Sequence, residues 1–156
     1  MPYKYQVLSD HRLLFGIFYG TLTPDEFMSG IDELSRNPAF KPHFDRLGIF
    51  HDTLDLSLFK MDDIVAIKER MVGAYYGGTL PAPSEDSSYR IAVVSKPSIN
   101  EAMLKLYGAT LASKMLSTVS VDTFQSLDGA LRWLARDDLI EEFRKPQWIE
   151  FLTVDP

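Results

Sequence analysis

Short apolar runs alternate along this chain with longer stretches in which apolar residues recur every three or four positions. The short runs are typical of strands and the longer stretches of amphipathic helices, and such alternation implies crossover connections and a mostly parallel sheet. The first two runs are separated only by a turn-rich link, which predicts an antiparallel hairpin. We therefore expect an α/β fold that starts with a β-hairpin and has a mixed, mostly parallel five-stranded sheet with about four helices. The expected strands are residues 4–8, 12–19, 46–53, 89–95 and 116–124.

The first helix has the clearest start signal. Thr23 suits the N-cap position, Pro24 the first helical position and Glu26 the third, which together make a capping box. A second helix is expected to open with Asp62 as its N-cap and Asp63 as its first residue. Two further helices are expected after Ser98 and Ser126. The residues expected to face the core from the four helices are Phe27, Ile31, Leu34, Ile64, Ile67, Met71, Ile99, Met103, Leu106, Thr110, Leu111, Leu127, Ala130, Leu131 and Leu134.

Two glycine-containing stretches interrupt this pattern. Gly16, inside the second apolar run, predicts either a close approach of another backbone or a bulge. Residues 73–88 are rich in Gly and Pro and are expected to form one long irregular loop. Loops of this length are typically functional lids or locally disordered segments. Tyr75 and Tyr76 would then belong to a lid over a pocket, or to an insertion without a function.

Composition excludes several classes of chemistry. The chain of 156 residues has no cysteine, which removes disulfides, thiolate catalysis, iron–sulfur clusters and cysteine zinc sites. Its net charge of −6 disfavours binding of nucleic acid, which needs a basic face. The first residues do not resemble a signal peptide, and the longest apolar run, residues 13–19, is too short to span a bilayer. We therefore expect one cytoplasmic domain without stable membrane insertion.

The last residues differ in character from the rest of the chain. Residues 1–136 hold the alternating pattern, and residues 137–156 are expected to form a C-terminal tail. Its first part predicts a short acidic helical turn, and residues 147–154 predict an apolar, strand-like segment that follows Pro146. Such a segment is expected to pack either on its own domain or on a neighbouring subunit.

His51 and Asp52 are the candidate catalytic residues. They end an expected strand, and ligands of open α/β sheets gather beyond the carboxyl ends of strands. His51 could act as a general base oriented by Asp52, Asp55 or Asp62. The alternative is structural, because adjacent strand residues point to opposite faces, and Asp52 would then cap the following turn. The sequence also lacks the P-loop, G-x-S-x-G, H-E-x-x-H and G-x-G-x-x-G motifs, which favours a protein that is not an enzyme.

No metal site or cofactor is expected. The acidic residues lack the spacing and the glycine of a calcium loop, and the isolated histidines have no partner at ligand spacing. The acidic residues are Asp52, Asp55, Asp62 and Asp63, and the isolated histidines are His11 and His43.

Three short segments resemble a known family. They are the G-x-L-T-x-x-E-F run of residues 20–27, the strand end Phe50-His51-Asp52, and Met61-Asp62-Asp63-Ile64 at the start of a helix. Over about residues 4–136 the chain resembles the SpoIIAA-like group of the STAS (sulfate transporter and anti-sigma-factor antagonist) superfamily. Phospho-switch members of that superfamily carry an Asp-Ser-Ser-Gly motif at this helix start. Here Asp63 and Ile64 replace the two serines and Val65 the glycine, so the resemblance implies the fold without the phosphorylatable switch.

This resemblance and the missing catalytic motifs lead to three expectations about function. The first is a non-enzymatic regulatory module that binds a protein partner or a second copy of itself through Asp55, Lys60, Asp62 and Asp63. The second, by analogy with lipid-transfer domains of similar architecture, is a carrier of a small apolar or lipid-like ligand. Its pocket would be lined by Phe50, Phe59, Ile67, Met71 and Met103, with Tyr75 and Tyr76 in the lid. The third is a hydrolase or lyase that uses His51 and nearby aspartates.

Overall fold

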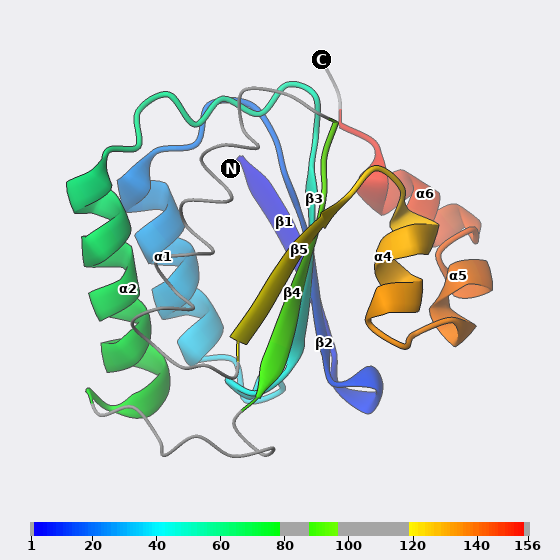
Figure 1. Ribbon diagram of the computed structural model, residues 1–156, viewed down its shortest axis with the longest axis horizontal. Helices are drawn as coiled ribbons and strands as arrows, with labels where there is room; N and C mark the ends of the chain where they lie inside the picture. The colour runs from blue at the N-terminus through cyan, green and yellow to red at the C-terminus, as the bar shows by residue number, and fades with distance from the viewer. Residues whose placement is uncertain (1, 79–87, 97–118, 155–156) are drawn as a thin grey trace.

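A single five-stranded sheet forms the centre of the molecule. The computed structural model describes residues 2–78, 88–96 and 119–154, and its strands follow the order β1-β2-β3-β4-β5. β1 and β2 are antiparallel, and the later neighbouring pairs are parallel. α1 and α2 cover one face, and α4, α5 and α6 cover the other (Figure 1). This arrangement confirms the predicted α/β class, the opening hairpin and the mixed, mostly parallel sheet. The elements are β1 (Tyr3–Leu8), the 3-10 turn η1 (Ser9–His11), β2 (Leu13–Phe18), α1 (Pro24–Ser35), β3 (Asp45–Phe50), α2 (Met61–Tyr76), β4 (Tyr89–Val94), β5 (Val119–Phe124), α4 (Leu127–Trp133), α5 (Asp138–Glu142) and α6 (Pro146–Leu152).

The start of α1 has the predicted capping box. The Thr23 hydroxyl accepts a hydrogen bond from the Glu26 backbone N–H at 3.1 Å, and the Glu26 carboxylate accepts one from the Thr23 N–H at 3.2 Å. The hydroxyl of Ser126 likewise accepts from the Gly129 N–H at 3.1 Å at the start of α4. Both caps satisfy backbone donors that a helix start leaves without a partner. The predicted start residues of these two helices are therefore confirmed.

The bounds of α2 differ from the prediction at both ends. Its N-cap is Lys60, and Asp63 is the third helical residue, whose carboxylate accepts the Lys60 N–H at 2.9 Å. The expectation that Asp62 is the N-cap was therefore wrong by two residues. The helix also continues to Tyr76 and ends where Gly77 adopts a φ of 64°. Residues 73–76 are thus helical and not part of a loop. Residues 79–87, and the helix expected after Ser98, lie outside the described residues.

The largest buried core lies on the face covered by α4, α5 and α6. Leu13, Phe15 and Leu47 of the sheet are almost fully buried against Ala130 and Leu131 of α4. Side chains alternate between the faces of a strand, so the intervening residues face α1 and α2. The sheet therefore separates this core from the space beneath the first two helices.

The C-terminal tail packs on this core as two short helices, α5 and α6. The ring of Phe15 lies 4.5 Å from that of Phe143, 5.8 Å from that of Trp148 and 5.5 Å from that of Phe151. The predicted strand over residues 147–154 is wrong for residues 147–152, which belong to α6. Trp148, Phe151 and Leu152 are three and four residues apart, so a helix brings all three to the same side. Pro146 at the start of α6 has the fixed φ that suits a first helical position.

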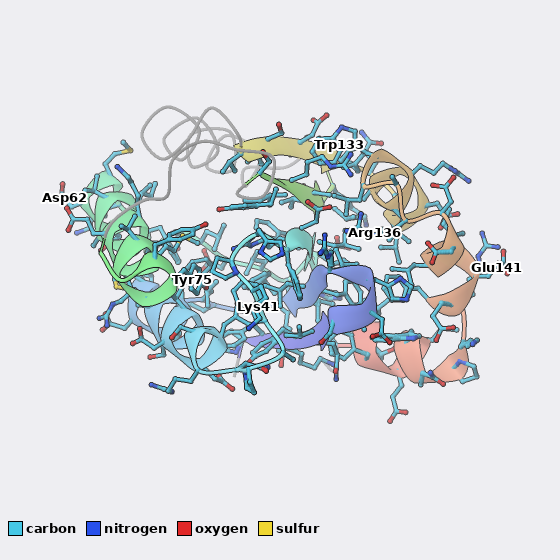
Figure 2. All side chains as sticks on the ribbon, turned by 90° about the horizontal axis from the view of Figure 1, so that it is seen from below. Lys41, Asp62, Tyr75, Trp133, Arg136 and Glu141 are labelled. Atoms are coloured by element: carbon cyan, nitrogen blue, oxygen red, sulfur yellow. The ribbon has the colours of Figure 1, made fainter. Side chains whose placement is uncertain are left out.

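A partly buried ionic network joins α4 to the amino ends of the strands. The Asp45 carboxylate accepts the Arg90 backbone N–H at 2.7 Å and lies 3.1 Å from the guanidinium of Arg136. Arg136 also donates to the His11 carbonyl oxygen at 2.9 Å. These contacts link β3, β4 and the β1–β2 turn to the end of α4. Figure 2 shows Arg136 and Trp133 on this side of the molecule.

Candidate functional site

The sheet face beneath α1 and α2 has a hollow at its centre. Residues that pair across neighbouring strands point to the same face, and the register pairs Gly16 of β2 with Gly48 of β3. Tyr5 of β1 pairs with Gly16 on one side, and Val93 of β4 pairs with Gly48 on the other. Two adjacent glycines leave a space that side chains would otherwise fill. A cavity of about 230 Å³ lies over them, between the sheet and the two helices.

One stripe of α1 and one stripe of α2 close this cavity opposite the sheet. The lining residues recur every three or four positions, as the apolar face of an amphipathic helix does. Both helices are therefore oriented by the same apolar residues that line the cavity. The helical lining residues are Phe27, Gly30, Ile31 and Leu34 of α1, and Ile64, Ile67, Met71 and Tyr75 of α2.

Aromatic rings form the end of the cavity nearest the carboxyl ends of β2 and β3. The ring of Phe18 lies 5.6 Å from that of Phe50 and 6.1 Å from that of Phe27. The ring of Phe59, in the β3–α2 connector, lies edge-on to Phe27 at 6.2 Å. Such stacked and edge-on contacts are favourable packing geometries for aromatic side chains. We call Phe18, Phe27, Phe50 and Phe59 the aromatic cluster.

Arg46 lies at the opposite end of the cavity. Its guanidinium carbon is 3.8 Å from the ring centroid of Tyr89 and 5.2 Å from that of Phe40. Its Nη1 donates to the carbonyl oxygens of Pro42 and Phe44, at 2.6 Å and 2.5 Å. Among the described residues, no carboxylate lies within ion-pair distance of Arg46, and its Nε and Nη2 donate to no protein atom. Cation–π contacts and these two hydrogen bonds together hold the guanidinium in place.

Tyrosine hydroxyls accompany Arg46 at this end. Burial raises the pKa of Tyr75, and the nearby Arg46 guanidinium opposes that shift. Burial also raises the pKa of Tyr76, with a further contribution from Tyr89. These phenols are therefore neutral hydrogen-bond donors at neutral pH. Figure 2 shows Tyr75 on the inner side of α2, whereas Asp62 lies on its outer side.

Most of the predicted pocket residues lie along this cavity. Tyr76 is half-buried on α2 but is not among the lining residues, and Met103 lies outside the described residues. The placement of Tyr75 in a helix also means that it forms part of a wall and not of a loop. The predicted residues that line the cavity are Phe50, Phe59, Ile67, Met71 and Tyr75.

His51 and Asp52 are not brought together. The imidazole Nδ1 of His51 lies 2.9 Å from the Thr53 hydroxyl and accepts the Thr53 backbone N–H at 3.2 Å. Asp52 instead pairs with Lys96 at 2.8 Å, and this contact holds the pKa of the Asp52 carboxyl below its usual range. Neither residue is among the described residues that line the cavity. A general base with an orienting carboxylate, the arrangement that would support a hydrolase, is therefore not formed by this pair.

The residues predicted as an interaction surface lie around the start of α2. Hydrogen bonds from Ser57 hold the pKa of the Asp55 carboxyl below its usual range, and Asp63 accepts the N–H of Lys60, so both acids stabilise local backbone. Lys60 and Asp62 are exposed. Three large apolar side chains next to them are also exposed. They are Leu58, Met61 and Val65, with 50%, 51% and 37% of their surface accessible.

Sequence reasoning missed the two features that give the cavity its shape and its charge. Gly16 was expected to mark a close approach or a bulge, and the structure shows a close approach, since a Cβ there would lie 3.2 Å from the Lys4 carbonyl oxygen. Its pairing with Gly48 depends on the strand register, which the sequence pattern did not fix. Arg46 was read only as the start of a strand. A signal for both was present, because glycine and arginine are unusual in a strand otherwise built of apolar residues.

Within residues 2–78, 88–96 and 119–154, no three His, Cys, Asp or Glu residues are grouped closely enough to hold a metal ion. His11 Nδ1 lies 3.5 Å from Asp138, and the ring of His43 packs against Phe44. Every helix in the same ranges is too short or too polar to cross a bilayer. Comparisons with protein-family models, with curated proteins and with solved structures found no match to this chain.

Proposed function

We propose that this protein binds a small apolar or amphipathic ligand between its sheet and helices α1 and α2. The observation that carries the proposal is the cavity of about 230 Å³ over the Gly16–Gly48 pair. An engineered apolar cavity of about 150 Å³ is large enough to bind benzene, so this space suits a molecule larger than one aromatic ring. A concave, mostly apolar pocket with a few polar groups is also the usual form of a ligand site.

The family resemblance is part of the same proposal. Residues 20–27, 50–52 and 61–64 carry the resemblance to the SpoIIAA-like group, and the carrier function comes from an analogy between architectures. In this proposal the protein is a STAS-like module without a phospho-switch, because Asp63 and Ile64 occupy the positions of the two serines. Its activity is binding and not catalysis.

Native mass spectrometry of the full chain purified from cells tests ligand binding. We expect a bound species of low mass in the wild-type protein. Gly48→Leu would place a branched side chain inside the cavity and should remove that species. Gly73→Leu is the matched control, because Gly73 lies exposed on α2 and an added Cβ would meet nothing within 4 Å. A wild-type protein that carries no bound mass and does not bind added decanol would contradict the proposal.

A second candidate function is self-association through the start of α2. The exposed Leu58, Met61 and Val65 form an apolar surface that also holds Lys60 and Asp62. In a two-fold contact the same surface meets itself, so Lys60 of one copy can lie against Asp62 of the other. This charge self-complementarity favours a second copy of the chain as the occupant.

Analytical ultracentrifugation over a range of concentrations tests self-association. We expect a reversible dimer that the double substitution Leu58→Asp and Met61→Asp weakens. Ile149→Asp is the control, because Ile149 is equally exposed, at 55%, but lies on α6 across the sheet. A wild-type protein that stays monomeric at the highest attainable concentration would exclude this surface as a dimer contact.

A further inference from the structure

Arg46 is the one charged side chain that faces the cavity among the described residues that line it. Lys4 also contributes to the lining, but its ammonium lies on the other face of the sheet, where it donates to the Thr153 carbonyl and lies over the Phe151 ring. The other described lining residues are apolar or carry tyrosine hydroxyls. A cation in such surroundings is costly unless an anion or several acceptors compensate for its lost hydration.

The partners of Arg46 satisfy only part of its hydrogen-bonding capacity. A guanidinium has five N–H donors. Nη1 uses its donors on the carbonyl oxygens of Pro42 and Phe44, and the faces of the group contact the rings of Tyr89 and Phe40. The Nε–Nη2 edge has no protein acceptor among the described residues. This edge presents two parallel N–H groups, the geometry that binds two oxygens of one carboxylate or phosphate.

We propose that the ligand of the cavity carries a single oxyanion head group, a carboxylate or a phosphate monoester, that binds the Nε–Nη2 edge of Arg46. The apolar part of the ligand then lies over the Gly16–Gly48 pair and reaches the aromatic cluster. This inference rests on the proposed ligand-binding function and names the class of ligand.

The dimensions of the site agree with such a molecule. Arg46 and Phe50 are four residues apart on β3, so the head-group end and the aromatic end are separated by roughly 13 Å along the strand. The path between them passes the glycine pair, which has no side chains of its own, and ends at the rings of Phe18 and Phe50. A medium-length alkyl chain or an aryl-alkyl group spans this distance.

The hydroxyl of Tyr75 adds a neutral donor to the head-group end. Tyr75 lines the cavity, its ring lies 5.4 Å from that of Phe40, and burial raises the pKa of its phenol. The phenol therefore stays protonated at neutral pH and places no negative charge beside Arg46. A bound oxyanion would meet one cation and a neutral donor, and no Asp or Glu is among the described residues that line the cavity.

Isothermal titration calorimetry with matched probes tests this inference on the full chain at neutral pH. The probes are decanoate, decyl phosphate and decanol, which share one alkyl chain and differ in the head group. We expect at least one anionic probe to bind about tenfold or more tighter than decanol, because charge-assisted hydrogen bonds to a guanidinium are strong. The tighter of the two anions tells a carboxylate ligand from a phosphate ligand.

Substitutions at Arg46 separate recognition of the head group from support of the loop. Arg46→Gln should reduce the affinity for the anion to that for decanol and leave the affinity for decanol unchanged. Arg46→Lys keeps the charge but not the paired donors, so it should keep part of the preference. Arg132→Gln, which removes an exposed guanidinium on α4 across the sheet, should keep the full preference.

The outcomes distinguish this inference from the function on which it rests. Equal affinities for decanol and both anions would overturn the head-group assignment while ligand binding stands. Binding of none of the probes would overturn both. If Arg46→Gln weakened all three probes by the same factor, Arg46 would only support the wall of the cavity, and the assignment would again be wrong.

Discussion

Gly48 and Gly16 occupy equivalent places in the sheet but differ in what surrounds them. A Cβ added at Gly48 would meet only ring atoms of Phe18 and Phe50, at 3.7 Å and 4.0 Å, which are ordinary contact distances. A Cβ added at Gly16 would lie 3.2 Å from the carbonyl oxygen of Lys4, which belongs to the neighbouring strand. The first glycine therefore provides volume, whereas the second also permits the close approach of β1.

Alanine substitutions at these two glycines should have opposite effects on stability. Gly48→Ala should raise the free energy of unfolding by about 0.4–1 kcal/mol, because it restricts the unfolded chain at a site with room for a methyl group. Gly16→Ala should lower the free energy of unfolding, because the added methyl group would crowd the Lys4 carbonyl oxygen. That oxygen belongs to the backbone of β1 and can move only if the strand moves. Urea denaturation measures both values. A loss of stability in Gly48→Ala would mean that the cavity has no room for a methyl group at this position.

The raised pKa of Tyr75 predicts how the stability of the protein changes at alkaline pH. Burial raises the pKa of its phenol in the folded state, while Arg46 opposes the shift and Tyr89, Tyr76 and Asp32 add to it. The unfolded chain releases this proton near pH 10 and the folded chain at a higher pH, so the contribution of Tyr75 is complete below about pH 10 and is lost above it.

The matching experiment compares the wild-type protein with Tyr75→Phe in urea between pH 9 and pH 11. The stability of the wild type relative to the variant should fall above pH 10, by up to about 1.4 kcal/mol for each pH unit. A difference between the two proteins that is the same at every pH would show that the Tyr75 phenol titrates alike in both states.

At the scale of the element, helix α1 begins with a local side-chain cap, whereas α2 combines local signals with a long-range contact. The capping box of Thr23 and Glu26 lies within four consecutive residues, so its hydrogen bonds need no contact with distant parts of the chain. α2 lacks a side-chain cap at Lys60 and continues through Gly73, and its last turn packs Tyr75 against Phe40. The last turn of α2 therefore combines a local stop at Gly77 with a contact to a residue 35 positions earlier in the chain.

Removal of the α1 cap gives a prediction at this scale. Thr23→Ala should lower the free energy of unfolding by about 1 kcal/mol, since a backbone donor loses its acceptor. Ser29→Ala, at an exposed position in the middle of the same helix, should leave stability unchanged or raise it, because alanine favours a helix more than serine does. Thermal or urea unfolding measures both, and equal effects would show that the cap does not stabilise α1.

At the scale of the whole molecule, the sheet divides two kinds of interior. The face towards α4, α5 and α6 is tightly filled by residues such as Phe15, Leu131 and Phe143. The other face holds the cavity, where many lining side chains are only half-buried. Both layers bury apolar side chains, but among the described residues only the layer beneath α1 and α2 combines them with an unfilled space.

The tail should behave as part of that filled layer. Phe143→Ala should lower the free energy of unfolding by about 3–5 kcal/mol, because the ring is buried and stacks on Phe15. Ile149→Ala should change it by less than about 0.5 kcal/mol, because the side chain is exposed. Urea denaturation gives both values. A small effect of Phe143→Ala would mean that α5 and α6 are not needed for the fold.

The sequence alone was sufficient to predict the class of the fold. The alternation of strands and helices, the capping boxes and the short link of the hairpin are local patterns, and each element forms from residues that are close together in the chain. The apolar stripe of α2 also pointed to Ile67 and Met71 as residues that face the sheet, and both line the cavity.

The tertiary structure decided everything that depends on residues far apart in the chain. Gly16 and Gly48 make a cavity only because the register places them side by side, and a shift of one residue would send both to the other face. The helix of residues 146–152 packs Trp148 and Phe151 against Phe15, which lies near the other end of the chain. Arg46 becomes a candidate anion site only because its neighbours are aromatic rings and carbonyls. Local patterns specify elements, whereas sites need long-range pairing, which no single segment of the sequence contains.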